Sequence, residues 1–213
     1  MRNMKRVLIA IVASIFLSAT ATATAQETYE EGKDYKRLST PVRTANPNKI
    51  ELVEAFSYTC AHCFAFESLI KQYKKTLPED VLFVRAHVSW DSMTENLARA
   101  LYTAKALKVE DEIHEALFKA LHIERKVIRT PEDIQAVFAA VGVDGEKFNR
   151  AFNSFGINSQ TKQATAKIRG YKIDSTPQLV VNGEYVISAN RDIDHKEMLK
   201  IADYLIAEIR KSK

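Results

Sequence analysis

A long helical stretch without any strand pattern divides this sequence, and it constrains the fold more than any other feature. Residues 93–168 show only helical patterns, with apolar residues three or four positions apart. Two β-rich segments precede this stretch, at 50–56 and 81–88, and two follow it, at 178–181 and 185–187. Strands on both sides of a helical block predict an α/β fold with an inserted all-helical domain.

Helices are expected between and after these strands. The segment 64–73 places Phe66, Leu69, Ile70 and Tyr73 on one face, so it forms a βαβ unit with the first two strands. The other expected helices are 96–107, 111–121, one from Thr130-Pro131 to Gly142, 146–155, 159–168 up to Gly170, and 194–210. In the last of these helices, Asp194 and Glu197 are placed as a capping box, and the expected buried stripe is Met198, Ile201, Leu205 and Ile209.

The remaining segments complete the expected organisation. Asn182-Gly183 between the last two strands is a strong β-hairpin signal, and the polar residues 26–48 are expected to hold an edge strand and a loop. The expected division is a signal peptide at 1–25, a sheet domain in two parts at 26–92 and 169–213, and the helical domain at 93–168.

The N-terminus has the features of a secretory signal. Arg2, Lys5 and Arg6 form a basic start, 7–17 is a short apolar run, and Ala23-Thr24-Ala25 is a small-residue cleavage pattern. The alternative is an uncleaved membrane anchor, which the short apolar run disfavours. We expect a mature protein beginning near Gln26 in the bacterial periplasm or an equivalent exported space, where disulfides persist.

The net charge gives no sign of a nucleic-acid partner. The formal charge of +4 falls to +1 once the three basic residues of the signal are removed. The remaining Lys and Arg residues are scattered along the chain, as is typical of a solvated surface, so no nucleic-acid binding is expected.

The only two cysteines, Cys60 and Cys63, lie where the first strand pattern gives way to a helix. A structural staple is disfavoured, because so short a loop contributes only about 2 kcal/mol by loop entropy. A zinc site is disfavoured because it needs four ligands, and His62 between the cysteines is poorly placed to join them. A redox pair is favoured: a sulfur at a helix N-terminus is stabilised as a thiolate, and a second sulfur one turn on resolves it.

The residues around this pair resemble the DsbA family of periplasmic thiol:disulfide oxidases. The run Phe56–Cys63, with Glu54 before it and Glu67 after it, is similar to the family's active-site segment, with CAHC in place of the usual CPHC. Thr176-Pro177 and the hairpin that follows are similar to its cis-proline loop. The resemblance covers the mature chain and implies a thioredoxin-like fold interrupted by an inserted all-helical domain.

The resemblance also implies an activity and partners. The family donates a disulfide to newly exported proteins with free thiols, and a DsbB-type inner-membrane quinone reductase reoxidises it. No cofactor or metal is implied, and we expect a monomer. A reductase or isomerase, or a peptide-binding chaperone with an incidental disulfide, remain the alternatives; the former stays open because Ala61 replaces a proline that tunes the redox poise.

Six site residues follow from the motif and the resemblance. Cys60 is expected to be the exposed low-pKa sulfur and Cys63 the resolving sulfur, with His62 as a cation or N–H donor to Cys60. The resemblance implies that Pro177 is cis and that Thr176 offers backbone groups to an extended substrate.

Glu54 is expected to handle protons as a buried acid, with Arg85 and Glu67 as its neighbours by resemblance. The alternative for Glu54 is an outward-facing strand residue, since strand faces alternate. His87 and Trp90 are expected to pack rather than to catalyse.

Overall fold

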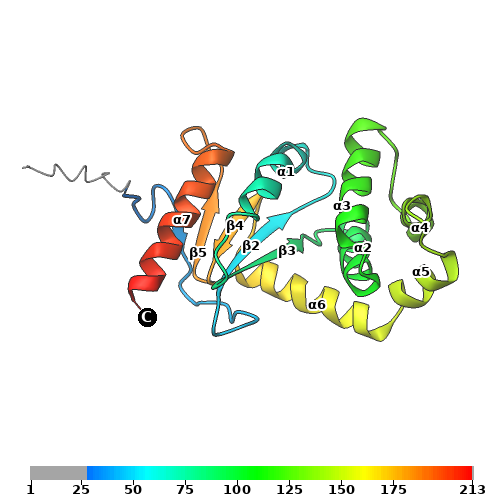
Figure 1. Cartoon of the computed structure of the whole chain (residues 1–213), viewed down its shortest axis with the longest axis horizontal. Helices are drawn as coiled ribbons and strands as arrows, with labels where there is room; N and C mark the ends of the chain where they lie inside the picture. The colour runs from blue at the N-terminus through cyan, green and yellow to red at the C-terminus, as the bar shows by residue number, and fades with distance from the viewer. Residues whose placement is uncertain (1–27, 213) are drawn as a thin grey trace, which may run out of the picture.

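The computed structural model describes residues 28–212, so the predicted signal peptide lies outside the described residues. A mixed sheet occupies one end of the molecule and a group of helices the other (Figure 1). The strand order is β1-β5-β4-β2-β3, with β2 and β3 parallel and the other neighbours antiparallel. The strands are β1 (Lys36–Arg37), β2 (Ile50–Phe56), β3 (Val81–His87), β4 (Gln178–Val181) and β5 (Tyr185–Ser188).

Strand β2 is the centre of the sheet, as its nearly continuous apolar pattern predicts. All of its residues are buried, with β3 on one side and β4 on the other. Helices α1 (Ala61–Tyr73) and α7 (His195–Lys211) pack on one face, and the C-terminal part of α6 (Phe155–Gly170) packs on the other. The expected edge strand is also present, since β1 pairs only with β5.

The helices between β3 and β4 form the predicted insertion (Figure 1). Their own core is apolar and extends to Phe56, Tyr58 and Cys63 at the end of β2 and in α1, so the insertion packs against the cysteine-bearing junction. The elements are α2 (Ser92–Leu107), α3 (Glu110–Phe118), the π-helical turn η1 (Lys119–Ile123), α4 (Pro131–Ala140), α5 (Gly145–Phe152) and α6.

Several local signals act as the sequence predicts. Thr130 caps α4, with Pro131 at its first position, and Gly142 follows the helix at a φ of +87°. Asn182 and Gly183 form the hairpin turn, both with positive φ. Gly183 is required there, because a Cβ at this position would lie 2.0 Å from the carbonyl oxygen of Val42.

Three expectations are corrected by the structure. The break between α5 and α6 lies earlier than expected, because Ser154 caps α6 by accepting a hydrogen bond from the Ile157 N–H at 3.2 Å. At the start of α7, Asp194 accepts from the Glu197 N–H, but the Glu197 carboxylate bonds the Tyr29 hydroxyl at 2.7 Å, so only half of the expected capping box forms.

The expected packing role of Trp90 is wrong. Its side chain is 54% exposed, because it follows the end of β3 in the loop before α2 and has no sheet face to lie on. His87, in contrast, is fully buried and packs edge-to-face against Phe56, as predicted.

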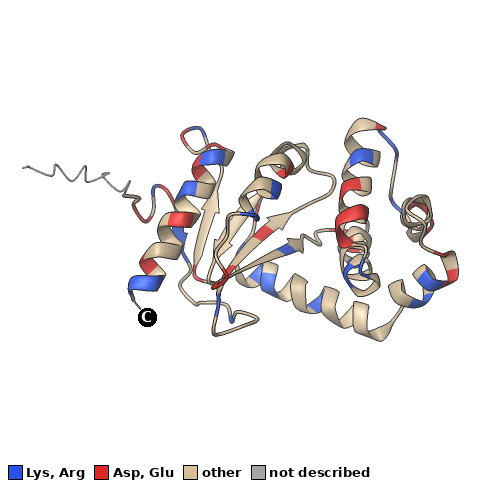
Figure 2. Cartoon of the chain, in the orientation of Figure 1, with Lys and Arg blue, Asp and Glu red and all other residues tan. Residues whose placement is uncertain are grey.

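Charges of both signs share the same helices. Figure 2 shows Lys and Arg interspersed with Asp and Glu along α7. No helix within residues 28–212 combines the length and apolarity that a membrane span requires.

Candidate active site

Cys60 and Cys63 occupy the junction between β2 and α1, where the sequence predicts them. Cys60 is the N-cap residue of α1 in an extended conformation and is partly exposed, whereas Cys63 lies in the first turn and is fully buried. Both are free thiols. The junction therefore presents one accessible sulfur and shields the other.

The two thiols differ sharply in acidity. The pKa of Cys60 is lowered to about 5, chiefly by a hydrogen bond from the Cys63 thiol, with further hydrogen bonds from the Thr176 side chain and from the Cys63 and His62 backbone N–H groups. Burial opposes this shift. The pKa of Cys63 is raised by that same hydrogen bond and by burial. At neutral pH the pair therefore holds one thiolate, on Cys60, and one proton, on Cys63.

The loop before β4 brings Thr176 and Pro177 to the same place. The Thr176–Pro177 peptide bond is cis, as the resemblance implies. In its thiol form, Cys60 donates a hydrogen bond to the Thr176 carbonyl oxygen at 3.2 Å. The loop thus borders the exposed sulfur, although it lies 116 residues away in the sequence.

His62 lies beside the motif but contributes differently from the expectation. The backbone N–H of His62 stabilises the Cys60 thiolate, while its side chain is exposed. Within the described part of the chain, its imidazole makes no hydrogen bond to the Cys60 sulfur; instead it lines a shallow pocket with Ile193 and His195. The expected donor at this position is therefore the main chain rather than the ring.

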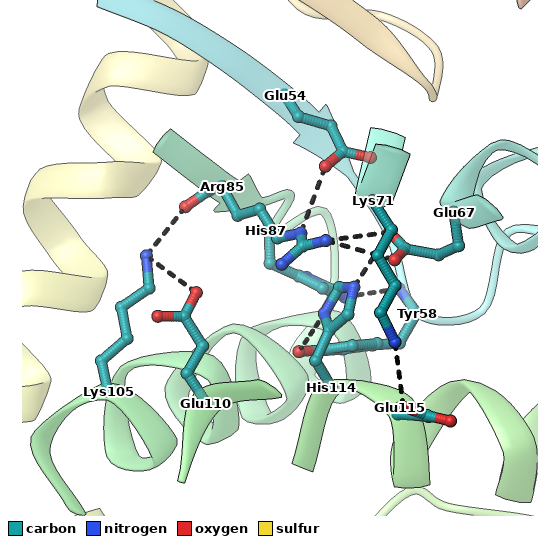
Figure 3. Close-up of polar contacts among 10 residues, drawn as sticks. All are labelled: Glu54, Tyr58, Glu67, Lys71, Arg85, His87, Lys105, Glu110, His114 and Glu115. Carbon is teal, nitrogen blue, oxygen red and sulfur yellow. Dashed lines mark hydrogen bonds and ion pairs between the residues drawn. The ribbon is translucent and has the colours of Figure 1, made fainter. Parts of the chain in front are cut away.

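Glu54 is buried and belongs to a charged cluster, which excludes the outward-facing alternative. Arg85, its direct neighbour on β3, donates from Nε to Glu54 Oε2 at 3.3 Å and from Nη2 to Glu67 Oε2 at 3.2 Å. His114 Nε2 lies 2.9 Å from Glu67 Oε1 on the other side. Figure 3 shows Arg85 between the two carboxylates, with His114 reaching Glu67 from α3.

The two carboxyl groups in this cluster titrate in opposite directions. Burial raises the pKa of Glu54 to about 7 despite the opposing charge of Arg85, and Glu54 Oε1 has no hydrogen-bond partner among the described groups. Burial also acts on Glu67, but His114 and Arg85 outweigh it and lower the pKa of that carboxyl. The cluster therefore contains one carboxyl group that can exchange a proton near neutral pH.

The structure places three residues beside this site that were not predicted from the sequence: Tyr58, His114 and His122. Each acts through contacts with residues far away in the chain, such as His114 with Tyr58, 56 positions apart. The one signal available was chemical, since a histidine in an amphipathic helix needs a polar partner when it is buried.

Comparisons with known proteins agree with this geometry. Residues 51–198 match the family model described as a DSBA-like thioredoxin domain. The chain is 38% identical over 210 residues to the thiol:disulfide interchange protein DsbA of Pseudomonas aeruginosa, covering 99% of this chain and 98% of that one. A crystal structure of Pseudomonas aeruginosa DsbA matches with a TM-score of 0.82 at 39% identity, over 86% of this chain and 96% of that one.

A more distant relative has the same fold. The crystal structure of the oxidoreductase DsbA from Xylella fastidiosa matches with a TM-score of 0.80 at 29% identity, over 86% of this chain and 98% of that one. The helical insertion between β3 and β4 and the cysteine pair at the start of α1 are thus parts of one known architecture. The chain belongs to the DsbA family of thioredoxin-like thiol:disulfide oxidoreductases.

Proposed function

We propose that this DsbA-family chain is a periplasmic oxidase that donates the disulfide between Cys60 and Cys63 to newly exported proteins. The single observation that carries the proposal is the asymmetry of the two thiols. Cys60 is accessible with a pKa of about 5, and Cys63 is buried with a raised pKa. A low-pKa sulfur is a good leaving group and stabilises the reduced form, so the disulfide is readily given away, an effect for which DsbA proteins are the standard example.

The reaction proceeds in two exchange steps. A substrate thiolate attacks Cys60 of the disulfide form, a mixed disulfide forms, and Cys63 leaves and takes up one proton. A second substrate thiolate then attacks the substrate sulfur of the mixed disulfide and expels Cys60 as a thiolate. The substrate loses two electrons and two protons; one proton stays on Cys63 and the other is released.

The surrounding residues suit supporting roles in these steps. The main chain at Thr176, beside cis-Pro177, is placed to bind an extended substrate next to Cys60, whose sulfur lies 3.2 Å from the Thr176 carbonyl oxygen. Glu54 has a pKa of about 7 and one carboxyl oxygen without a hydrogen-bond partner in the described part of the chain, which suits it to accept and return the proton of the cysteine pair. His62 contributes its backbone N–H to the thiolate.

The proposed cycle needs partners that regenerate the disulfide. We place the mature protein in the periplasm on the strength of the N-terminal signal pattern, and we assign its reoxidation to a DsbB-type quinone reductase in the inner membrane. Family membership supports both assignments.

The proposal is tested by trapping the Cys60–Cys63 pair in cells and measuring its redox state. We expect a predominantly disulfide-bonded pair, and we expect C63A to accumulate mixed disulfides with exported proteins, because it lacks the resolving thiol. A predominantly reduced pair would indicate a reductase. Full cellular function of a variant that lacks both cysteines would indicate a peptide-binding chaperone.

A further inference from the structure

Tyr58 lies two residues before Cys60, and each of its polar groups meets a different histidine. The residue is fully buried in the turn between β2 and α1. Its N–H, its carbonyl oxygen and its hydroxyl group contact His87, His122 and His114, respectively. These three histidines come from β3, η1 and α3, so two of the three belong to the helical insertion.

The bond from β3 defines one end of this arrangement. The Tyr58 N–H donates to His87 Nε2 at 2.9 Å, so this nitrogen carries no proton. The other ring nitrogen, Nδ1, then carries the hydrogen and donates to the Val88 carbonyl oxygen at 2.6 Å. Burial lowers the pKa of His87 to about 4, which keeps the ring neutral in this role.

His122 contacts the chain on both sides of the cysteine motif. Its Nε2–H donates to the Tyr58 carbonyl oxygen at 2.7 Å, ahead of Cys60. Its ring stacks on Phe64, directly after Cys63, with centroids 4.9 Å apart and planes 6° from parallel. The π-helical turn Lys119–Ile123 carries His122, and single π-turns of this kind recur at functional sites.

His114 links the Tyr58 hydroxyl to the charged cluster. Its Nδ1 lies 3.1 Å from the hydroxyl oxygen, and its Nε2 lies 2.9 Å from Glu67 Oε1, a close contact that falls short of hydrogen-bond geometry. The carboxylate beside Nε2 favours the tautomer with its proton on that nitrogen, so Nδ1 of the neutral ring accepts from the Tyr58 hydroxyl. Figure 3 shows His87 and His114 converging on Tyr58 from two elements.

A short, bonded turn connects Tyr58 to the reactive sulfur. The Cys60 N–H donates to the Ser57 carbonyl oxygen at 3.1 Å, and the Thr59 N–H donates to the Ser57 hydroxyl at 3.3 Å. A shift of Tyr58 would therefore move Cys60 relative to the His62 and Cys63 N–H groups that face its sulfur. Reactive groups need such a second layer of contacts to hold their geometry.

We propose that Tyr58 is a positioning residue through which His122 and His114 of the helical insertion hold Cys60 at the start of α1. His122 holds the main chain through the carbonyl, and His114 holds the side chain through the hydroxyl. The insertion thereby contributes to the reactivity of a cysteine on the sheet domain without touching its sulfur. The proposal extends the proposed function, but it concerns the enzyme alone and does not depend on which client or partner is used.

The test compares His122→Phe, which keeps a stacking ring and removes the donor, with His122→Gln, which keeps a donor and removes the ring. The pKa of Cys60 is read from thiolate absorbance in the reduced enzyme, and the disulfide equilibrium is measured against glutathione. We expect His122→Phe to raise the Cys60 pKa by about 0.5–1 and to shift the equilibrium about three- to tenfold toward the disulfide form. This is the effect expected if loss of the His122 hydrogen bond is felt fully or partly at the Cys60 thiolate. We expect His122→Gln to restore most of this change.

Two further variants keep the test decisive. Tyr58→Phe removes only the hydroxyl, keeps the fold, and is expected to shift the Cys60 pKa in the same direction by a smaller amount. Ile123→Ala changes an exposed side chain of the same π-helical turn and serves as the matched control, with no expected change.

Three results would overturn the proposal. One is a wild-type Cys60 pKa in folded His122→Phe and Tyr58→Phe, and another is an equal shift in His122→Phe and His122→Gln. The third is lower unfolding stability with an unchanged glutathione equilibrium, because a merely structural role predicts it. Since all readouts use purified enzyme and glutathione, failure here is distinguishable from failure of the oxidase proposal, which is tested in cells.

Discussion

Two glutamates on strand β2 are both buried, yet their surroundings are opposite. Glu51 accepts hydrogen bonds from the Ala45 N–H at 2.8 Å, Lys167 Nζ at 3.3 Å and the Tyr171 hydroxyl at 3.4 Å. Glu54 lies three residues on and therefore on the other face of the strand. Among residues 28–212 its one hydrogen-bond partner is Arg85, and its Oε1 has none. The first carboxylate is fully satisfied and the second is not.

This difference separates a structural role at Glu51 from the proposed proton-handling role at Glu54. A buried carboxylate with a full set of hydrogen-bond donors stabilises the fold. A buried carboxylate with an oxygen that lacks a donor pays a desolvation free energy larger than the attraction of its one cationic partner. The pKa of Glu54 accordingly rises to about 7. Glu51 thus links Lys167 of α6 and the main chain at Ala45 to the sheet, whereas Glu54 is the carboxyl group that we propose exchanges a proton with the cysteine pair.

The largest loss of stability is expected from substitution of Arg85, the cation shared by Glu54 and Glu67. Arg85→Met leaves two carboxylates without their shared cation, and we expect a loss of about 3–5 kcal/mol in the free energy of unfolding at pH 8. At pH 5 the loss should be smaller, because protonation of Glu54 removes one of the two charges. Urea unfolding at both pH values measures this.

The control for that substitution is Arg85→Lys, which keeps the charge and loses the forked geometry, and which should cost less. A loss below about 1 kcal/mol for Arg85→Met at pH 8 would contradict the assignment of a strongly coupled buried cluster.

The next effect concerns the pH dependence of stability at Glu54. Because its pKa is raised from 4.5 to about 7 by burial, the folded state holds a proton between these values that the unfolded state has released. Stability from this group is therefore present at low pH and lost as pH rises through this window, by about 2–3 kcal/mol. Glu54→Gln should remove that loss.

The disulfide form is the one to use for this measurement. In the reduced form the lowered pKa of Cys60 has the opposite sign, since its contribution is lost as pH falls toward about 5. Equal pH profiles for the wild type and Glu54→Gln in the disulfide form would show that Glu54 does not titrate in this range.

Substitution of Glu51 is expected to lower the stability of the fold without changing its redox chemistry. Glu51→Gln turns an amide group toward donors and removes the charge that Lys167 faces, so we expect a loss of about 2 kcal/mol in the free energy of unfolding. The glutathione equilibrium and the Cys60 pKa should stay at their wild-type values. A changed Cys60 pKa would contradict the assignment of a purely structural role to Glu51.

The smallest effect is expected at Tyr171. Tyr171→Phe removes one long hydrogen bond to Glu51 and leaves two stronger partners in place, so the expected loss is about 0.5–1 kcal/mol. Thermal unfolding of this variant beside Glu51→Gln measures it. A loss equal to that of Glu51→Gln would mean that Tyr171 alone satisfies the carboxylate.

Local patterns predicted the elements better than they predicted the contacts. The strand at 50–56, the cap at Thr130-Pro131 and the hairpin at Asn182-Gly183 all depend on residues within a few positions, and all three are confirmed. The break between α5 and α6 was predicted after Phe155, but α5 already ends at Phe152, because Ser154 caps the start of α6. Trp90 was wrongly predicted to be a packing residue, because the apolar character of a side chain does not indicate whether the fold provides a surface that covers it.

The sequence by itself determined the place of the chemistry. Two cysteines at a strand-to-helix junction place one sulfur at the helix N-cap and the other in the first turn, because helix geometry at the N-terminus depends only on neighbouring residues. The tertiary structure alone decided which buried groups are satisfied: Glu51 meets Tyr171 across 120 positions, Glu54 meets Arg85 across 31, and Tyr58 meets His122 across 64. Hydrogen bonds and burial depend on distances in space, and chain spacing does not encode these until the sheet and the helical insertion have packed together.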